Sequence, residues 1–231
     1  TNLLTAIADA RLDSIPLVAI TGQVAQSLLG TDAFQEVDTF GLTLPITKHN
    51  WLVRSARELL TIIPEAFRLA MSGRPGPVVV DVPKDVQMET VEFDEWPEPA
   101  RADAPLRPEA EAIDRMAEMI AAARRPIFYI GGGIIGAEAS AVLMRVAERA
   151  SIPVVSTLMG LGAMPSDHPL ALGMLGMHGA RSTNTAMEEA DLIIAAGVRF
   201  DDRATGKVAE FCPNASVIHI DIDPAELGKI R

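Results

Sequence analysis

Short apolar runs alternate with helix-like segments along the chain, and this alternation constrains the fold more than any other feature. The runs are rich in Val and Ile and lack the polar alternation of a half-exposed strand. Such runs are typical of parallel strands covered by helices on both faces. We expect strands at residues 16–20, 77–82, 126–130, 153–156, 192–196 and 216–220. The alternation predicts an α/β fold with doubly wound, mostly parallel sheets.

Between these runs, apolar residues recur at helical spacing. Residues 139–150 show the pattern, and residues 113–121 show it behind Pro108, a residue suited to the first position of a helix. Residues 56–71 are helix-like but contain Pro64, so we expect a kink or two short helices there. A last helical pattern runs over residues 224–229. Because both ends of the chain fall within helix-like patterns, we expect a segment of a longer protein.

A proline-rich acidic stretch separates two parts of the chain. Residues 89–106 include Pro97, Pro99 and Pro105 among several acidic side chains. This composition resists packing and predicts an extended linker. We therefore expect two units, residues 1–88 and residues 107–231.

Charge and cysteine content exclude several classes of protein. The 231 residues carry a net charge of -11, which disfavours nucleic acid as a partner because an acidic surface repels phosphates. The apolar runs are too short to span a membrane. Cys212 is the only cysteine, so a disulfide framework is excluded, and a reducing cytoplasm is the expected location.

A glycine cluster at residues 131–136 follows the expected strand at residues 126–130. Its glycines allow a ligand to approach the backbone, and the helix N-terminus behind them is expected to attract anions. Gly131, Gly133 and Gly136 match the dinucleotide fingerprint. The next strand ends without the acid that holds the ribose of NAD, which disfavours an NAD site. A tight turn without a ligand is the alternative.

Two further segments, residues 157–162 and 172–179, are rich in glycine and methionine. They can form a flat apolar surface for a large planar ligand. Core packing is the alternative for Met174 and Met177. His178 lies in this glycine-rich segment and can present a ring or backbone N–H to a ligand. No second ligand stands at a suitable spacing, so we expect no metal site.

Charged residues follow the last two expected strands. Residues 197–203 contain two arginines suited to a pyrophosphate, with aspartates that can orient them, and a surface ion-pair network is the alternative. Asp221 or Asp223 can hold an adenine or ribose group, and a solvated strand end with a helix cap is the alternative. The clusters that begin at residues 131, 157, 197 and 221 each follow an expected strand, as expected for a dinucleotide that lies across a sheet edge.

The first unit carries weaker signals. Residues 31–38 form a polar loop in which Asp32, Phe34 and Gln35 can face a substrate, and a capped helix start at Thr31 or Asp32 is the alternative. Arg74 and Lys84 place positive charge at the two ends of the expected strand 77–82, and surface salt bridges are the alternative for both.

Several long motifs together carry a family resemblance. The motifs occupy residues 13–23, 30–38, 72–77, 172–179 and 199–203. They resemble the large catalytic subunits of acetohydroxyacid (acetolactate) synthases, which are thiamine-diphosphate-dependent enzymes, and the similarity covers essentially the whole chain. The Arg-Phe-Asp-Asp-Arg pattern at residues 199–203 is similar to the FAD-containing, biosynthetic type.

The resemblance implies roles for both units. Residues 1–88 would be the later part of the pyrimidine-binding domain, and residues 107–231 most of the central, Rossmann-like FAD-binding domain. Gln35 and Lys84 would line the active-site entrance, with Phe34 near the flavin. The residues that would bind FAD are Arg74, Gly131, Gly132, Gly133, Thr157, Leu158, Met159, Leu175, Gly176, Met177, His178, Gly197, Val198, Arg199, Asp201, Arg203 and Asp221.

The resemblance also implies the reaction. Two pyruvates, or pyruvate and 2-ketobutyrate, would condense with loss of carbon dioxide to 2-acetolactate or 2-aceto-2-hydroxybutyrate, the first common step of branched-chain amino acid biosynthesis. Thiamine diphosphate would act as electron sink, and FAD would have a structural role because no net redox change occurs. A homodimer or tetramer of large subunits, with a regulatory small subunit, is the implied assembly.

The chain departs from the family pattern in three respects. The glutamate that activates the thiamine ring is expected upstream of Thr1, and the Gly-Asp-Gly motif for magnesium is absent from the sequence. This segment alone is therefore expected to be inactive. Ala25 stands where many relatives carry Pro. The sequence therefore does not predict the shape of the substrate channel. The alternatives are an isolated FAD-binding module and a related carboligase such as glyoxylate carboligase.

Overall fold

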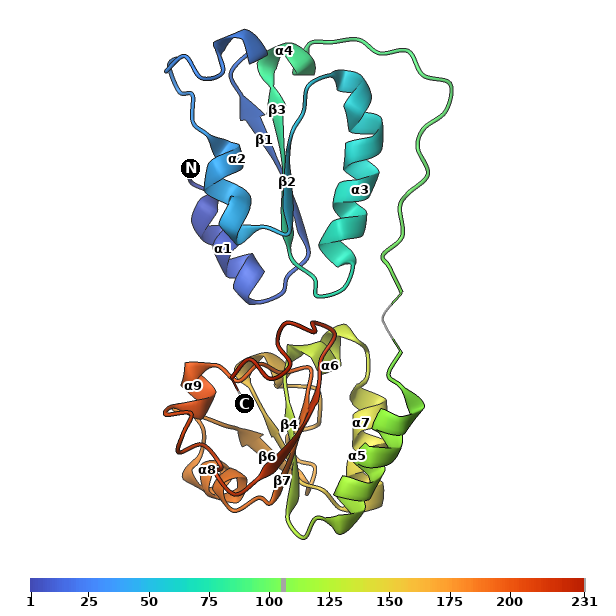
Figure 1. The fold of residues 1–231 in the computed structure, drawn as a ribbon, viewed down its shortest axis with the longest axis vertical. Coiled ribbons are helices and arrows are strands. Elements are labelled where there is room, and N and C mark those ends of the chain that lie inside the picture. The colour runs from blue at the N-terminus through green and yellow to red at the C-terminus, as the bar shows by residue number, and fades with distance from the viewer. Residues whose placement is uncertain (105–106, 231) are drawn as a thin grey trace. The chain divides into compact units, whose positions relative to one another are not determined.

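The computed structural model describes residues 1–104 and 107–230, and it divides the chain into two compact units, Thr1–Pro105 and Leu106–Arg231 (Figure 1). Pro105 and Leu106 of the predicted linker, and Arg231 at the end of the second predicted unit, lie outside the described residues. No helix in the described part combines the length and the apolar character that crossing a bilayer demands.

The first unit contains a parallel sheet of three strands. Their order is β1-β3-β2, with β1 at Leu17–Gln23, β3 at Pro77–Pro83 and β2 at His49–Leu52. Figure 1 shows α1 and α2 on one face of this sheet and α3 on the other, with bounds Leu4–Leu12, Thr39–Thr43 and Leu59–Met71. Every residue of the central strand β3 is buried, because neighbouring strands and both helical layers cover it.

Short elements complete the first unit. Three 3₁₀ turns and one short helix connect its strands and long helices. They are η1 Gln26–Leu28, η2 Leu44–Ile46, η3 Ala56–Glu58 and α4 Lys84–Gln87.

The second unit contains a parallel sheet of five strands in the order β6-β5-β4-β7-β8. The strands are β4 Pro126–Ile130, β5 Val154–Ser156, β6 Ala171–Met174, β7 Leu192–Ala196 and β8 Ser216–Ile220. The helices and turns are α5 Ala110–Ala122, α6 Gly132–Gly136, α7 Ser140–Ala150, η4 Leu158–Gly160, α8 Arg181–Glu188 and α9 Asp202–Thr205.

Helices cover both faces of this second sheet. Figure 1 shows α5 and α7 on one face and α8 on the other. Successive residues of β4 supply the two cores: Phe128 and Ile130 pack on the side of α7, and Ile127 and Tyr129 pack on the side of α8. The parallel pairing and the two-sided cover confirm the predicted α/β fold.

Some predicted elements differ from the structure. The single helix α3 continues through Pro64, so of the predicted kink or two short helices the second alternative is wrong, and the kink stays a prediction. Burial of Ala66 and Ala70 against β3 offsets the hydrogen bond that proline removes. Pro108 precedes the N-cap Glu109 of α5 and is not the first helical residue. Residues 224–229 form turns rather than a helix.

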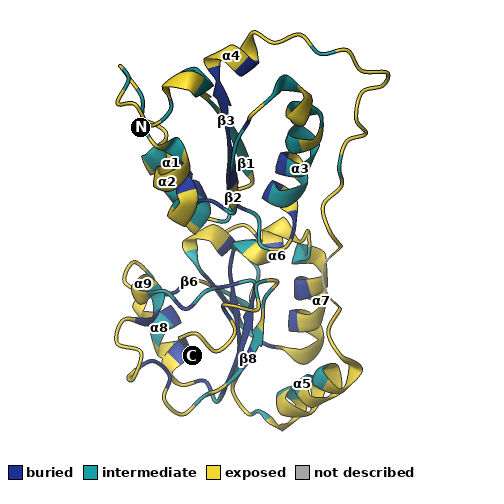
Figure 2. Cartoon of the chain, turned by 45° about the horizontal axis from the view of Figure 1, so that its top comes forward, coloured by how far each residue is buried: buried dark blue, intermediate teal, exposed yellow. Residues whose placement is uncertain are grey.

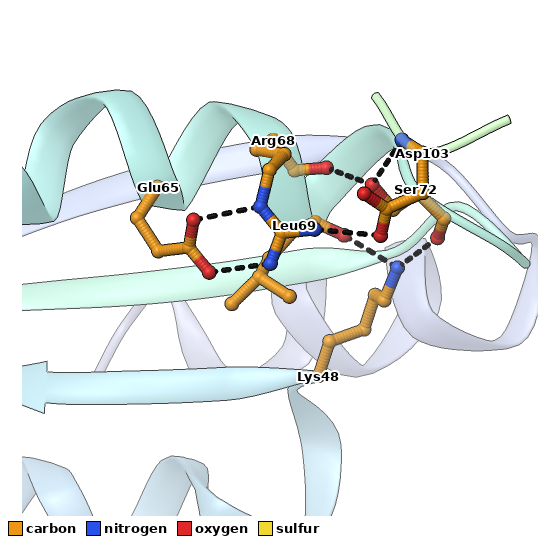
Figure 3. Close-up of polar contacts among 6 residues, drawn as sticks. All are labelled: Lys48, Glu65, Arg68, Leu69, Ser72 and Asp103. Carbon is orange, nitrogen blue, oxygen red and sulfur yellow. Dashed lines mark hydrogen bonds and ion pairs between the residues drawn. The ribbon is translucent and has the colours of Figure 1, made fainter. Parts of the chain in front are cut away.

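The predicted linker contains no helix or strand over residues 89–104 and is mostly exposed (Figure 2). It is nevertheless attached to the first unit at both ends. Glu89 accepts a hydrogen bond from the backbone N–H of Ala56 at 2.7 Å. At the other end, Asp103 pairs with Arg68 of α3 at 2.6 Å, and its backbone N–H donates to Ser72 Oγ at 2.9 Å (Figure 3).

Arg68 and Lys48 organise the attachment of Asp103. Arg68 also pairs with Glu65 one turn earlier in α3, at 2.5 Å. Lys48 donates to the carbonyl oxygens of Leu69 and Ser72, where α3 ends (Figure 3). The Arg68 guanidinium lowers the pKa of Asp103 below its usual value, so the carboxylate stays ionised at neutral pH.

Candidate functional site

The carboxyl ends of the five strands of the second unit lie together at one end of the sheet, because all pairs are parallel and in register over most of their length. In open α/β sheets, ligands bind at the carboxyl ends of the strands. The loops that leave it contain all the cofactor residues predicted in residues 107–231. These loops begin at Gly131 after β4, Thr157 after β5, Leu175 after β6, Gly197 after β7 and Asp221 after β8.

The loops after β4 and β7 touch through their backbones. The N–H of Gly133 donates to the carbonyl of Gly197 at 3.0 Å. A Cβ added to Gly133 would lie 2.5 Å from Gly197 Cα, and a Cβ added to Gly131 would lie 2.4 Å from Gly197 O. Glycine at these positions is therefore a condition for the two turns to meet.

Gly136 differs from these two glycines. A Cβ added there would meet nothing within 4 Å, although the residue completes the dinucleotide fingerprint in the sequence. The helix behind the turn, α6, has only five residues, Gly132–Gly136. So short a helix aligns few peptide dipoles, and the anion attraction at this turn stays a prediction.

The loop after β5 joins the same cluster. The N–H of Thr157 donates to Ile130 O at 2.9 Å, and Thr157 Oγ1 accepts from the N–H of Gly160 at 3.1 Å. This turn leaves Leu158 and Met159 exposed by 69% and 45%. Two apolar side chains thus face solvent beside the glycine turns, and such exposure is typical of a ligand surface.

The loop after β6 contacts the segment after β7. The N–H of Met177 donates to Arg203 O at 3.0 Å, and a Cβ on Gly176 would lie 2.5 Å from the same oxygen. Asn184 of α8 fixes Gly176 by bonding both its N–H and its carbonyl. Met177 is 60% exposed, so the alternative of core packing is wrong for it, and the neighbouring His178 is also exposed.

The loop after β7 carries the predicted Arg–Asp cluster. Asp201 accepts from the backbone N–H groups of Arg203 and Ala204, both at 3.0 Å, and so caps α9. Arg203 and Asp202 form a loose, exposed pair at 3.9 Å. The carboxylate of Asp201 has a local structural role, while the Arg199 guanidinium forms no ion pair within the described part of the chain.

Tyr129 of β4 contacts this loop through Arg199 and Phe200. The sequence did not predict this role. The ring is fully buried, packs 5.6 Å from the ring of Phe200, and its hydroxyl donates to Arg199 O at 3.5 Å. Burial, and then the nearby Asp201 carboxylate, raise the pKa of Tyr129 well above its usual value. The only sequence signal was an aromatic inside an apolar strand, which indicates core packing and not loop support.

Asp221 lies at the end of β8, and its side chain is only 11% exposed. Its carboxylate accepts from the N–H of Asp223 at 2.9 Å. Sequence reasoning gave no role to His219, which lies on the same strand. Its ring Nε2–H donates to Val198 O, 3.0 Å away, and its Nδ1 is buried without a hydrogen-bond partner among the described residues.

A cavity of about 440 Å³ opens between the loop after β6 and α9. Leu175, Gly176, Met177 and Arg203, four of the predicted cofactor residues, line part of its wall, and buried Cys212 lies at its far side. These four residues thus border a concave region of the size that small-molecule ligands require, and the other predicted residues of the second unit do not line it.

In the first unit the predicted residues fall at opposite ends of the sheet. Lys84 begins α4 directly after β3, whereas Arg74 precedes β3 and donates to Ser14 Oγ at 2.8 Å. A seven-residue strand separates the two by roughly 20 Å. Gln35 lies in the loop between η1 and α2, with the left-handed φ of 61°. A helix starting at Thr31 or Asp32 is absent from this described segment, because α2 starts at Thr39 with Asp38 as its cap.

Comparison with known proteins gives the sequence relationships of both units. Residues 113–231 match the family model described as thiamine pyrophosphate enzyme, central domain. Residues 1–42 match the model described as thiamine pyrophosphate enzyme, N-terminal TPP binding domain.

Curated relatives align with the whole chain. The acetolactate synthase isozyme 1 large subunit of Escherichia coli is 60% identical over 100% of this chain and 41% of its own length. The isozyme 2 large subunit of the same organism is 52% identical over 100% of this chain and 42% of its own length. A probable acetolactate synthase large subunit of Methanocaldococcus jannaschii is 50% identical over 99% of this chain and 40% of its own length. The chain thus spans about two fifths of these relatives.

Proposed function

Because this chain belongs to the thiamine pyrophosphate enzyme family, we propose that it is part of the large catalytic subunit of an acetolactate synthase. The alignment of the whole chain with the E. coli isozyme 1 large subunit, at 60% identity, carries this proposal. The proposed reaction joins two pyruvates, or pyruvate and 2-ketobutyrate, with loss of carbon dioxide. It begins the synthesis of the branched-chain amino acids.

We propose cofactor-binding roles for both units from the family relationship. Residues 1–88 would belong to the pyrimidine-binding domain and residues 107–231 to a central domain that holds FAD. Bound thiamine pyrophosphate supplies the electron sink that decarboxylation and carbon–carbon bond formation need. Gln35 and Lys84, near the carboxyl ends of the first sheet, would orient the 2-ketoacid at the entrance of the site.

Four observations support an FAD cradle in the second unit. The glycine turns after β4 and β7 pack backbone to backbone, and Gly133 stays exposed at this contact. Leu158, Met159 and Met177 offer an apolar surface of the kind a planar ring system covers. Arg199 and Arg203 can neutralise a pyrophosphate. The partly buried Asp221, with the unbonded Nδ1 of His219 two residues before it, suits hydroxyl and amino groups of an adenosine moiety.

The remaining functional assignments follow from the relatives. Two of them are named large subunits of numbered isozymes, and we infer a regulatory small subunit as a partner for this chain as well. We also infer an assembly of two or four large subunits. The cytoplasm stays the expected compartment, since the single cysteine is buried and reduced.

The direct test uses the full-length protein that contains this chain. With pyruvate, thiamine pyrophosphate, Mg²⁺ and FAD, we expect one acetolactate and one carbon dioxide for every two pyruvates, measured by mass spectrometry and gas release. Glyoxylate in place of pyruvate serves as the control for a related carboligase. Absence of acetolactate, or a faster reaction with glyoxylate, would contradict the proposal.

A pair of substitutions tests the cradle in the same enzyme. We expect Arg199→Ala to weaken FAD binding by roughly tenfold or more, because a charge-assisted contact to phosphate is lost. Arg149→Ala removes the same charge from the exposed face of α7 and serves as the matched control. The measurement is the FAD dissociation constant from fluorescence titration. Equal constants for both variants would argue against the cradle.

A further inference from the structure

One loop of the first unit has a backbone that it would not adopt unaided. Residues 30–38, here called the 30–38 loop, connect η1 to α2 and contain Gln35 and a phenylalanine, Phe34, that is 89% exposed. Asp32 and Gln35 have φ angles of 57° and 61°, a left-handed conformation that costs energy in residues other than glycine. Contacts elsewhere must therefore hold this loop.

The carboxylate of Glu36 holds the first half of the loop. It accepts hydrogen bonds from the backbone N–H groups of Gly30, of Thr31 at 3.3 Å and of Ala33 at 3.1 Å. These N–H groups, that of Gly30 foremost, lower the pKa of Glu36 below its usual value. The group is therefore ionised at neutral pH and bonds across the turn that presents Phe34.

Gln23, at the end of β1, holds the second half. Its Nε2 donates to Val37 O at 2.8 Å, and its Oε1 accepts from the N–H of Val24 at 2.9 Å. The same Nε2 donates to Asp81 Oδ2 at 3.1 Å. Because both ends of the amide are engaged, its orientation is fixed and Val37 is fixed with it.

Asp81 anchors this hydrogen-bond chain in the sheet. Only 2% of the residue is exposed, on the fully buried strand β3, and Thr21 Oγ1 donates to its other oxygen at 2.6 Å. A buried carboxylate is costly unless hydrogen bonds satisfy it, and here Thr21 and Gln23 do so. The rigid centre of the sheet is thus connected through Gln23 to a loop that lies on the surface.

From this geometry we infer that Glu36 and the Asp81–Gln23 pair are positioning residues, which order the 30–38 loop before substrate arrives. The inference rests on the proposed function, in which Gln35 lies at the entrance for the 2-ketoacid. A loop ordered in advance loses less conformational entropy on binding, so the same contacts give a higher affinity. None of the three positioning side chains needs to contact substrate.

Loop order is measured with a nitroxide spin label on Phe34→Cys in the full-length protein. The native Cys212 is 1% exposed, and the extent of labelling in the protein with Phe34 intact corrects for it. We expect Glu36→Gln and Gln23→Met each to increase the mobile component of the spectrum. Glu98→Gln makes the same charge change on an exposed linker residue and should leave the spectrum unchanged. Identical spectra for all three would overturn the inference.

Kinetics on the Phe34 enzyme supply the second measurement. We expect Glu36→Gln to raise KM for pyruvate by roughly two- to tenfold, with kcat within about twofold of the parent, because only loop ordering is lost. A purely structural role would lower the melting temperature relative to Glu98→Gln and leave KM unchanged, which would also overturn the inference. A parent enzyme without acetolactate formation overturns the proposed function instead, and the spectra alone then decide about the loop.

Discussion

Backbone contacts distinguish the glycines in the turn after β4. Gly131 and Gly133 each approach the backbone of Gly197 so closely that an added Cβ would overlap it, while Gly136 has open space at that position. The sequence predicted the turn and its three glycines from one pattern. It could not separate them, because the distinction depends on Gly197, which lies more than sixty residues further along the chain.

The contrast gives a prediction with an internal control. We expect Gly133→Ala to destabilise the protein by about 1–3 kcal/mol, because the methyl group must push two packed turns apart. Gly136→Ala should change stability by less than about 1 kcal/mol and in the stabilising direction, since alanine favours a helix. Chemical denaturation monitored by circular dichroism measures both. Equal effects would show that the close approach to Gly197 does not constrain the turn.

The sequence did not predict the roles of several buried or partly buried polar side chains. Tyr129, His219 and Asp81 look like ordinary members of strands in the sequence, and their roles depend on partners from other elements. By contrast, Met177 and Arg203 lie in glycine-rich or charged loops. The sequence could propose them as candidate ligand-binding residues, because their types are unusual at strand ends.

At the scale of elements, six strands were predicted and two were missed. The missed strand β2 contains His49 and Asn50 and has no apolar run. Asn50 is nevertheless buried, because its side chain donates to Phe40 O at 2.7 Å and to Thr43 Oγ1 at 2.8 Å. The missed strand β6 is an edge strand with an irregular register against β5 and a left-handed Gly173. Neither kind of strand has the pattern that identifies a buried one.

One carboxylate connects the starts of two central strands in the second unit. Asp191, directly before β7, accepts from the backbone N–H groups of Arg124 and Arg125 at 2.8 and 2.9 Å, where the chain enters β4. These bonds, that of Arg124 foremost, lower the pKa of Asp191 below its usual value. A carboxyl whose pKa is lowered by folding stabilises the protein above its unfolded pKa, and this contribution is lost as pH falls through the folded pKa.

A pH series tests this connection. We expect Asp191→Asn to melt at a lower temperature than the parent at neutral pH, with the difference shrinking between about pH 5 and about pH 2. Asp94→Asn, on the exposed linker, serves as the control and should follow the parent throughout. A difference for Asp191→Asn that stays constant with pH would contradict the role of the ionised carboxylate.

At the scale of the whole molecule, the composition of residues 89–106 predicted a linker but not its attachment. The segment has no helix or strand in residues 89–104, as expected, yet Asp103 pairs with Arg68 of the first unit (Figure 3). An acidic residue within a proline-rich stretch gives no sign of which arginine it will contact. The two-unit organisation could therefore be inferred from the sequence, whereas this contact required coordinates.

The attachment predicts where a protease will cut. Arg101 lies two residues before Asp103 and is a site for trypsin in an exposed segment. We expect Asp103→Asn to accelerate cleavage there by roughly twofold, because an exposed ion pair restrains the segment only weakly. Time-resolved mass spectrometry of the digest measures the rate, with Glu98→Gln as control. A rate equal to the control would mean that the pair does not restrain the linker.

In our proposal, loops from separate strands of the second unit form one flavin site. Titration of FAD into the flavin-depleted full-length protein in a calorimeter tests this. We expect one FAD bound per chain, with binding retained by Gly136→Ala and lost or strongly weakened by Gly133→Ala. No FAD binding by the parent protein, or equal FAD binding by the two variants, would contradict it.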